Sequence, residues 1–225
     1  MNTEQTELER ATLQTFLSSS WFAEDEAAPT VARLLEQPCD DEERQLLLSY
    51  AAEENGHAAL IARHFAANGL KFGEPFWIQR VFRLARSRPT MLLQMYTVEV
   101  LACFFYAAMA QRTKDKDAQA LIKVLLRDEA RHIRLTRELL TRELARQTPA
   151  ARLKTRALAG VFRAAVAVTA WVQSRQLRPV LGETGFTFSV KLFRLLSSDR
   201  AALFRAPTEP NRPLGWWWRP QAVAA

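Results

Sequence analysis

Two short segments of this sequence place a glutamate three residues before a histidine. The first reads EENGH and contains Glu54 and His57, and the second reads DEARH and contains Glu129 and His132. Three residues turn an α-helix by about 300°, so each pair shares one helix face and can bind the same ion. Carboxylate oxygens and imidazole nitrogens suit iron or manganese. The chemistry that these pairs indicate is metal binding.

A single carboxylate in the least polar part of the chain adds to this set. The segment 89–111 is apolar almost throughout, and Glu99 is its one charged residue. An ionised carboxylate is costly to bury unless it is paired or bound to metal. A membrane span is an alternative, but Gln94 and Glu99 interrupt the roughly 20 apolar residues that a span requires. We therefore expect a buried helix on which Glu99 faces a metal or an arginine.

The spacing of these residues repeats along the chain. Glu24 precedes Glu54 by 30 residues and Glu99 precedes Glu129 by 30, and the two sets are offset by 75. The chain therefore reads as two copies of one helix hairpin, each contributing Glu and then Glu-x-x-His. Paired, the hairpins would bring four carboxylates and two imidazoles to one centre. Spacing favours Glu24 over Glu26 as the ligand from the first helix.

The helices that position these residues are indicated by apolar periodicity and by start and stop signals. We expect one long helix with a kink or break near Pro29, a crossover with a short helix, and further helices ended by Asn68-Gly69 and by Pro179, Gly182 and Gly185. No segment has a convincing strand pattern. The expected helices cover about 4–36, 41–67, 80–85, 89–112, 118–147, 151–177 and 189–204.

The predicted fold class is therefore all-α. The first four long helices form a bundle over residues 1–147 with one long crossover, and residues 148–225 form a basic helical extension with a Pro- and Trp-rich tail that packs on the bundle. The whole chain is 48% hydrophobic and 24% charged, with seven glycines, which is typical of a packed protein. Two cysteines suggest no disulfide framework, and a polar, acidic start lacks the pattern of a signal peptide, so we expect a cytoplasmic protein.

With these motifs in place, the chain resembles the ferritin-like di-iron carboxylate proteins, whose bundles carry one Glu on each of two helices and Glu-x-x-His on each of the other two. The resemblance covers roughly 10–145. The segments EDEA, VEVLACFFY and RDEARH are similar to segments of aldehyde-deformylating oxygenases and rubrerythrins. It implies a ferritin-like bundle with these metal ligands: Glu24, Glu54, His57, Glu99, Glu129 and His132.

The resemblance implies two iron ions, with iron/iron favoured over manganese/iron, in an oxygenase or oxidase that activates O₂ against a small organic substrate, carrier-bound or acyl substrates included. Catalytic residues beyond the ligands are unknown. Electrons would come from a separate reductase or ferredoxin, because the chain has no GxGxxG and no CxxC motif. Apolar side chains would exclude water, with these candidates for the walls: Met95, Tyr96, Phe104 and Phe105.

Two rival functions follow from the same resemblance. One is iron oxidation or peroxide scavenging of the ferritin or bacterioferritin kind, which the second ExxH histidine, the basic extension and the lack of a four-cysteine module disfavour. The other is a di-iron hydroxylase that modifies tRNA. The basic end of the chain supports it, because residues 146–225 hold 13 Lys and Arg against 3 Asp and Glu. No recognisable RNA-binding module accompanies that charge.

Several residues keep two interpretations. Glu53, Asp25 and Asp128 stand beside ligands and either orient the histidines or are solvated. Cys103 lies one turn after Glu99 and is either a pocket wall or core, whereas His64 is expected to be structural. The basic extension is either a helical lid with solvated arginines or a surface for an acidic partner, namely an acyl carrier protein, a membrane surface or RNA.

Overall fold

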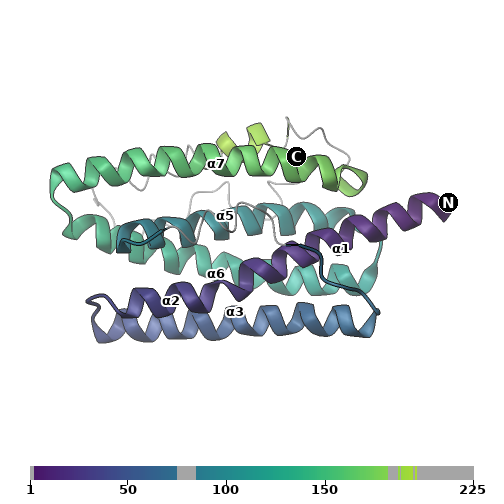
Figure 1. Cartoon of the computed structure of the whole chain (residues 1–225), viewed down its shortest axis with the longest axis horizontal. Coiled ribbons are helices and arrows are strands. Elements are labelled where there is room, and N and C mark those ends of the chain that lie inside the picture. The colour runs from purple at the N-terminus through teal and green to yellow at the C-terminus, as the bar shows by residue number, and fades with distance from the viewer. Residues whose placement is uncertain (1–2, 75–84, 182–186, 188, 195, 197–225) are drawn as a thin grey trace.

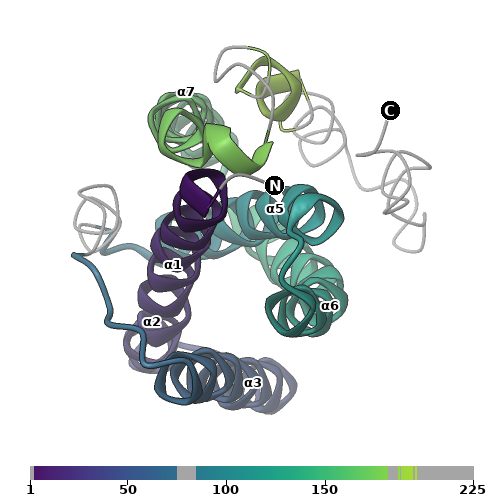
Figure 2. The ribbon, with the colours of Figure 1, turned by 90° about the vertical axis from the view of Figure 1, so that its right-hand side faces the viewer.

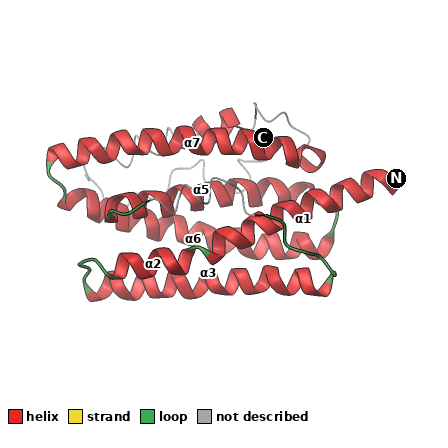
Figure 3. Ribbon diagram, viewed as in Figure 1, coloured by secondary structure: helices red, strands yellow, loops and turns green. Residues whose placement is uncertain are grey.

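The computed structural model of this chain describes residues 3–74, 85–181, 187, 189–194 and 196. These residues form helices, turns and loops but no strand, which confirms the predicted all-α class (Figure 3). The long helices run roughly along the longest axis of the molecule (Figure 1).

The first predicted helix is divided into two. α1 spans Thr3–Asp25, α2 spans Ala27–Leu35, and Glu26 separates them as the N-cap of α2. A proline ring clashes with the carbonyl group four residues before it, and for Pro29 that residue is Asp25. The predicted break near Pro29 is therefore confirmed, and it falls three residues before the proline, directly after the turn that carries Glu24.

The second predicted helix, here α3, spans Asp41–Ala67, as the sequence indicates. Asp40 caps its start, because the Asp40 carboxylate accepts a hydrogen bond of 2.8 Å from the Glu43 backbone N–H. Asn68 ends it, and Gly69 follows with a φ of 60°, a conformation that glycine adopts without steric cost.

α5 spans Arg88–Arg112 and α6 spans Lys116–Arg146, so both begin slightly earlier than predicted. Ser87 and Thr90 form a capping box at the start of α5, and Asp115 caps α6 by accepting a hydrogen bond from the Ala118 N–H. The short helix expected at 80–85 falls outside the described residues except for Ala85, which is not helical.

α7 spans Pro149–Leu181 and corrects the prediction that Pro179 breaks this helix. A proline so near a helix end removes a single backbone hydrogen bond, and α7 continues to the residue before Gly182. Of the helix predicted over 189–204, residues 189–194 are helical, and the Pro- and Trp-rich tail lies outside the described residues.

The helices enclose a common interior (Figure 2). α3 packs against α1 and α2 on one side and against α6 on the other, and α6 packs along α5. α7 lies over α1 and α5. The largest fully buried side chains come from α1, α2, α3, α5 and α6, and include Leu17, Leu34, Leu47, Ile61, Met91, Met109, Ile122 and Leu125.

α5 is the most buried helix and resolves the question of a membrane span. It is one of two helices in the described chain that are long and apolar enough to cross a membrane, but 83% of its apolar window is buried inside the protein. Its apolar side chains are satisfied by the neighbouring helices rather than by lipid. Glu99 is therefore a buried carboxylate of a core helix, as the sequence predicts.

Candidate metal centre

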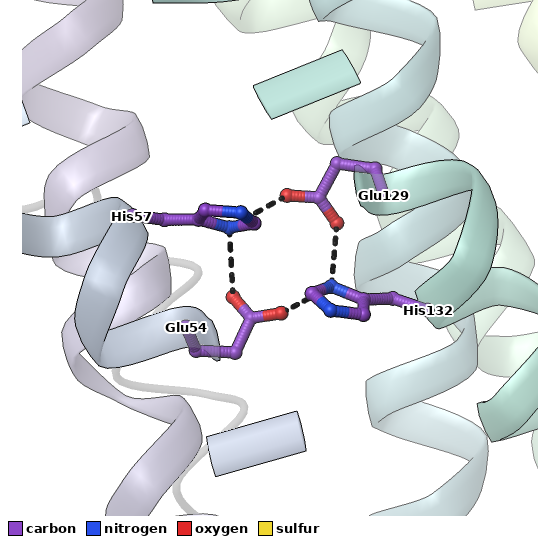
Figure 4. Close-up of side chains that lie close together, drawn as sticks. All are labelled: Glu54, His57, Glu129 and His132. Atoms are coloured by element: carbon purple, nitrogen blue, oxygen red, sulfur yellow. Dashed lines mark hydrogen bonds and ion pairs between the residues drawn. The ribbon is translucent and has the colours of Figure 1, made fainter. Parts of the chain in front are cut away.

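Four side chains from two helices form a closed ring in the interior (Figure 4). Glu54 and His57 project from α3, and Glu129 and His132 project from α6. Each contributes one potential ligand atom, and these atoms all lie within 4.8 Å of one another. All four residues are at most 3% exposed. The two helices therefore meet through a cluster of carboxylates and imidazoles that can hold a metal ion.

The ring alternates carboxylate and imidazole groups. His57 Nδ1 lies 3.9 Å from Glu54 Oε2 and 3.6 Å from Glu129 Oε1. His132 Nδ1 lies 2.5 Å from Glu54 Oε1 and 3.3 Å from Glu129 Oε2. Both histidines thus direct the same ring nitrogen to the same two carboxylates, and the ExxH pairs act as one unit across the helix interface.

Glu24 reaches this ring from the last turn of α1. Its carboxylate lies 3.3 Å from His57 Nδ1 and contacts Glu54, and its other oxygen accepts a 2.7 Å hydrogen bond from the Tyr106 hydroxyl. Asp25 is exposed, and Glu26, at the N-cap position of α2, lines the adjoining pocket instead of joining the ring. The structure therefore places Glu24, the residue favoured by spacing, against the ring.

Glu99 approaches from α5 on the side of Glu129. The two carboxylates contact each other, and Glu99 accepts a hydrogen bond from the Tyr50 hydroxyl. Glu99 is buried, and no arginine is recorded as its partner within the described residues. All six residues singled out from the sequence therefore meet at one place, with the ring of four at the centre and Glu24 and Glu99 beside it.

The outward nitrogens of the two histidines are held by acidic residues from the opposite helix. His57 Nε2 lies 3.5 Å from Asp128 Oδ2, and His132 Nε2 lies 2.9 Å from Glu53 Oε2. Arg131 contacts both acids, at 2.7 Å from Glu53 and 3.3 Å from Asp128. Of the two interpretations of Glu53 and Asp128, orientation of the histidines is the one that fits these contacts.

The six groups are electrostatically crowded. Burial, reinforced by the charge of neighbouring carboxylates, raises the pKa of Glu54, Glu99 and Glu129 well above the ordinary value. Burial also acts to raise the pKa of Glu24, but hydrogen bonds with Glu54 and His57 outweigh it and lower that pKa.

The pKa of His57 is also raised, but for a histidine this favours the charged form. Burial acts to lower its pKa, but the carboxylates of Glu24 and Asp128 outweigh burial and raise it. Without a cation, this interior therefore holds more acidic groups than it can keep ionised at low cost.

The donor set fits a metal. Apart from the imidazole nitrogens that approach them at 2.5 Å and 3.6 Å, Glu54 Oε1 and Glu129 Oε1 are buried without a hydrogen-bond partner, which is costly unless something else satisfies them. A bound cation would satisfy both oxygens and remove the repulsion between the carboxylates. Four carboxylates and two imidazoles are hard and borderline donors that suit iron or manganese.

A pocket of about 120 Å³ adjoins the cluster between α1, α2, α5 and α7. Tyr50 and Tyr106, the two tyrosines bonded to Glu99 and Glu24, form part of its wall. Of the wall residues expected from the sequence, Met95 and Phe105 line it, whereas Tyr96 and Phe104 are buried elsewhere. Cys103 is fully buried and outside this lining, so it belongs to the core.

Tyr50 and Tyr106 were not predicted as site residues, although their spacing carried a signal. Tyr50 stands four residues before Glu54, and Tyr106 stands seven after Glu99, so each shares a helix face with a candidate ligand. Their partners lie on other helices, which periodicity alone does not reveal.

No family model matches this chain, and no curated protein matches it. What the chain shows by itself is a helical protein with a buried carboxylate–histidine cluster that can bind metal.

Proposed function

We propose that this chain is a ferritin-like four-helix bundle that holds two iron ions and acts as an O₂-activating non-haem oxygenase or oxidase of a small organic substrate. The observation that carries the proposal is the closed, buried ring of Glu54, His57, Glu129 and His132, in which each carboxylate lies between the two imidazoles. Glu24 and Glu99 complete a set of four carboxylates and two imidazoles, as the di-iron resemblance implies.

The proposed function gives each of the six candidate ligands a role. Glu54 and Glu129 each face both histidines, so these two carboxylates would hold the metal together with His57 and His132. Glu24 and Glu99 close the two ends of the site. Ferrous iron, when bound there, would supply the reducing power that O₂ activation needs, and an external reductase or ferredoxin would restore it.

The surroundings of the cluster suit oxidative chemistry better than iron storage. Apolar side chains of α5 shield the carboxylates from water, and Tyr50 and Tyr106 hold two of them in place by donating hydrogen bonds. A pocket for an organic molecule lies against these tyrosines. Iron storage needs no such pocket, so its presence beside the ligands favours an oxygenase or oxidase.

Rapid mixing of the anaerobic, ferrous-loaded protein with O₂ tests the proposal. We expect O₂ uptake and a transient visible absorption. Both are lost in Glu129→Gln and retained in Glu138→Gln, a control on the same helix whose side chain is 56% exposed. Accumulation of many irons per chain in a large spherical assembly would overturn the proposal in favour of storage. Equal O₂ uptake in the two variants would also overturn it.

A further inference from the structure

The pocket beside the cluster is lined by apolar and polar side chains, and one of the buried polar side chains is unsatisfied. Gln94 is 7% exposed, lines the pocket, and its side-chain oxygen has no hydrogen-bond partner. A buried amide oxygen without a partner is costly, so such a group usually receives a hydrogen bond from another molecule or side chain. The surface of the lining is mainly apolar, with Phe16, Ala27, Met95, Leu101, Phe105 and Leu177, but the lining also includes the polar residues Ser19, Ser20, Glu26, Thr30 and Gln173.

The placement of the pocket connects it to the candidate metal ligands. α5 turns about 100° per residue, so Gln94, Val98, Leu101 and Phe105 fall on one face. Tyr106 lies at the edge of that face, lines the pocket, and donates its hydroxyl hydrogen bond to Glu24. Tyr50 does the same for Glu99 from the side of α3. A molecule in the pocket would therefore contact both tyrosines that hold the carboxylates.

We infer that this pocket binds a compact, mainly apolar substrate that carries a single hydrogen-bond donor, a hydroxyl or amine N–H, received by Gln94. Only the reaction of the bound substrate rests on the proposed function; the binding of the substrate to the pocket does not. An engineered apolar cavity of about 150 Å³ accommodates benzene. The cavity of about 120 Å³ therefore suits one ring or a short aliphatic chain. Leu177 makes α7 part of the binding site rather than a remote appendage.

Probe binding to metal-free and iron-loaded protein tests the inference, with benzyl alcohol and toluene as probes and ligand-observed NMR as the readout. We expect the alcohol to bind more tightly than toluene. Gln94→Met should weaken the alcohol by about threefold to tenfold and leave toluene unchanged. Leu177→Trp should displace both probes, whereas Val161→Trp on the exposed side of α7 should displace neither.

Two results would overturn it. One is the absence of binding of either probe to folded wild-type protein. The other is binding that Gln94→Met leaves unchanged, a result that remains decisive if Leu177→Trp does not fold. The pocket is probed in the metal-free protein as well. If the protein binds the alcohol but never binds iron, this inference stands and the proposed oxygenase function is wrong.

A second, independent observation concerns the outer face of α7. Four large apolar side chains on it are exposed: Leu153 (68%), Val161 (64%), Val168 (49%) and Trp171 (41%). They fall on one helix face, opposite the side that packs on α1 and α5. Only 28% of the apolar window of this helix is buried, in contrast to α5. A continuous apolar stripe of this kind marks an interaction surface.

The charges of α7 indicate what the stripe contacts. The helix has no acidic residue and carries basic residues near both ends of the stripe: Arg152, Lys154 and Arg156 at one end, and Arg175 and Arg178 at the other. A second copy of this helix would bring like charges together. A surface that is apolar beneath and anionic at its face complements both features, and an anionic lipid bilayer has that composition.

We propose that the outer face of α7 docks on an anionic membrane surface, with Val161, Val168 and Trp171 entering the headgroup boundary. Cosedimentation with vesicles tests this. We expect binding to phosphatidylcholine vesicles that contain phosphatidylglycerol, and not to phosphatidylcholine alone. The double variant Val161→Glu/Val168→Glu should bind more than about tenfold more weakly. Val124→Glu, at an exposed valine of α6, is the matched control.

Failure to bind anionic vesicles would overturn this proposal. An equal loss of vesicle binding in the control variant Val124→Glu would also overturn it. A dimer abolished by Val161→Glu/Val168→Glu would assign the stripe to self-association instead. Salt-sensitive RNA binding that survives the double variant would assign the basic residues to nucleic acid.

Discussion

Glu53 on α3 lies 2.9 Å from Nε2 of His132 on α6, while the next residue of α3, Glu54, faces Nδ1 of the same histidine. Adjacent residues of one helix thus hold both nitrogens of an imidazole on another. Asp128 and Glu129 do the same for His57, so the arrangement is reciprocal. The cluster is therefore positioned by two acidic dipeptides, EE and DE, rather than by the ExxH pairs alone.

Removing the outer acid of either dipeptide should weaken metal binding without removing a ligand. Glu53→Gln and Asp128→Asn each replace the charged acceptor at the outward nitrogen of one histidine by a weaker, neutral one, and loss of such an outer contact typically lowers metal affinity by about 10–100-fold. Competition with a colorimetric Fe(II) chelator measures the change. Glu42→Gln, an exposed position of the same helix, should leave affinity unchanged. Unaltered affinity in both test variants would show that the outer contacts do not orient the histidines.

The metal-free protein should lose stability as pH rises. The pKa of Glu54 is raised well above 4.5 by burial and by the charges of Glu24 and Glu129. The folded protein therefore retains this proton at pH values where the unfolded chain has lost it, and the free energy of unfolding falls as pH increases above about 4.5. Glu54→Gln removes that charge while keeping the shape.

The Glu54→Gln variant should accordingly melt at a higher temperature than wild type at pH 8 in the presence of a chelator, with a smaller difference at pH 4. Differential scanning calorimetry of the two proteins measures this. A lower melting temperature at pH 8 would mean that Glu54 is stabilised by its ionised form even without metal.

Cys103 should be chemically inert in the native protein. Burial and the charges of Glu129 and Glu99 raise the pKa of its thiol far above the ordinary value, which suppresses the reactive thiolate. Cys39 is half-buried and should react. Mass spectrometry after iodoacetamide treatment should find a single adduct, at Cys39, and a second only in denaturant. Rapid native labelling of Cys103 would contradict its placement in the core.

A buried ion pair at one end of the helices should contribute strongly to stability. Glu43 is fully buried and lies 2.7 Å from Arg88 and 2.9 Å from Arg146. Glu43→Ala leaves the buried Arg88 without its nearest partner and should cost about 3–5 kcal/mol in the free energy of unfolding. Urea denaturation measures it.

The adjacent Glu42 supplies the control. Its side chain is 67% exposed and pairs with Arg142 at 2.9 Å, so Glu42→Ala should cost less than about 1 kcal/mol. A similar loss of unfolding free energy in the two variants would show that burial does not determine how much these ion pairs stabilise the protein.

The candidate site was predictable because it rests on local helix geometry. Residues three apart on a helix share a face wherever that helix packs, so the ExxH pairs could be found without a tertiary structure. The repeat of 30 and 75 residues then related Glu24 and Glu99 to them. The break at Glu26 was visible through Pro29, although its position depended on the clash with Asp25.

Contacts between helices far apart in the chain were harder to predict from the sequence. The reach of Glu53 to His132 and of Tyr106 to Glu24 depends on how helices pair, which periodicity does not specify. The pocket is the clearest example, because Leu177 and Gln94, from two helices far apart in the chain, both line it. The extent of α7 beyond Pro179 was also missed, because a proline is tolerated near a helix end.

Elemental analysis of protein from iron-supplemented cells tests the central claim, that the buried cluster is a metal centre, most directly. We predict about two irons per chain. The double variant Glu54→Gln/Glu129→Gln should lose them, and Glu42→Gln should retain them. Well-folded wild-type protein without bound metal, and indistinguishable from the double variant when iron is added back, would contradict the claim.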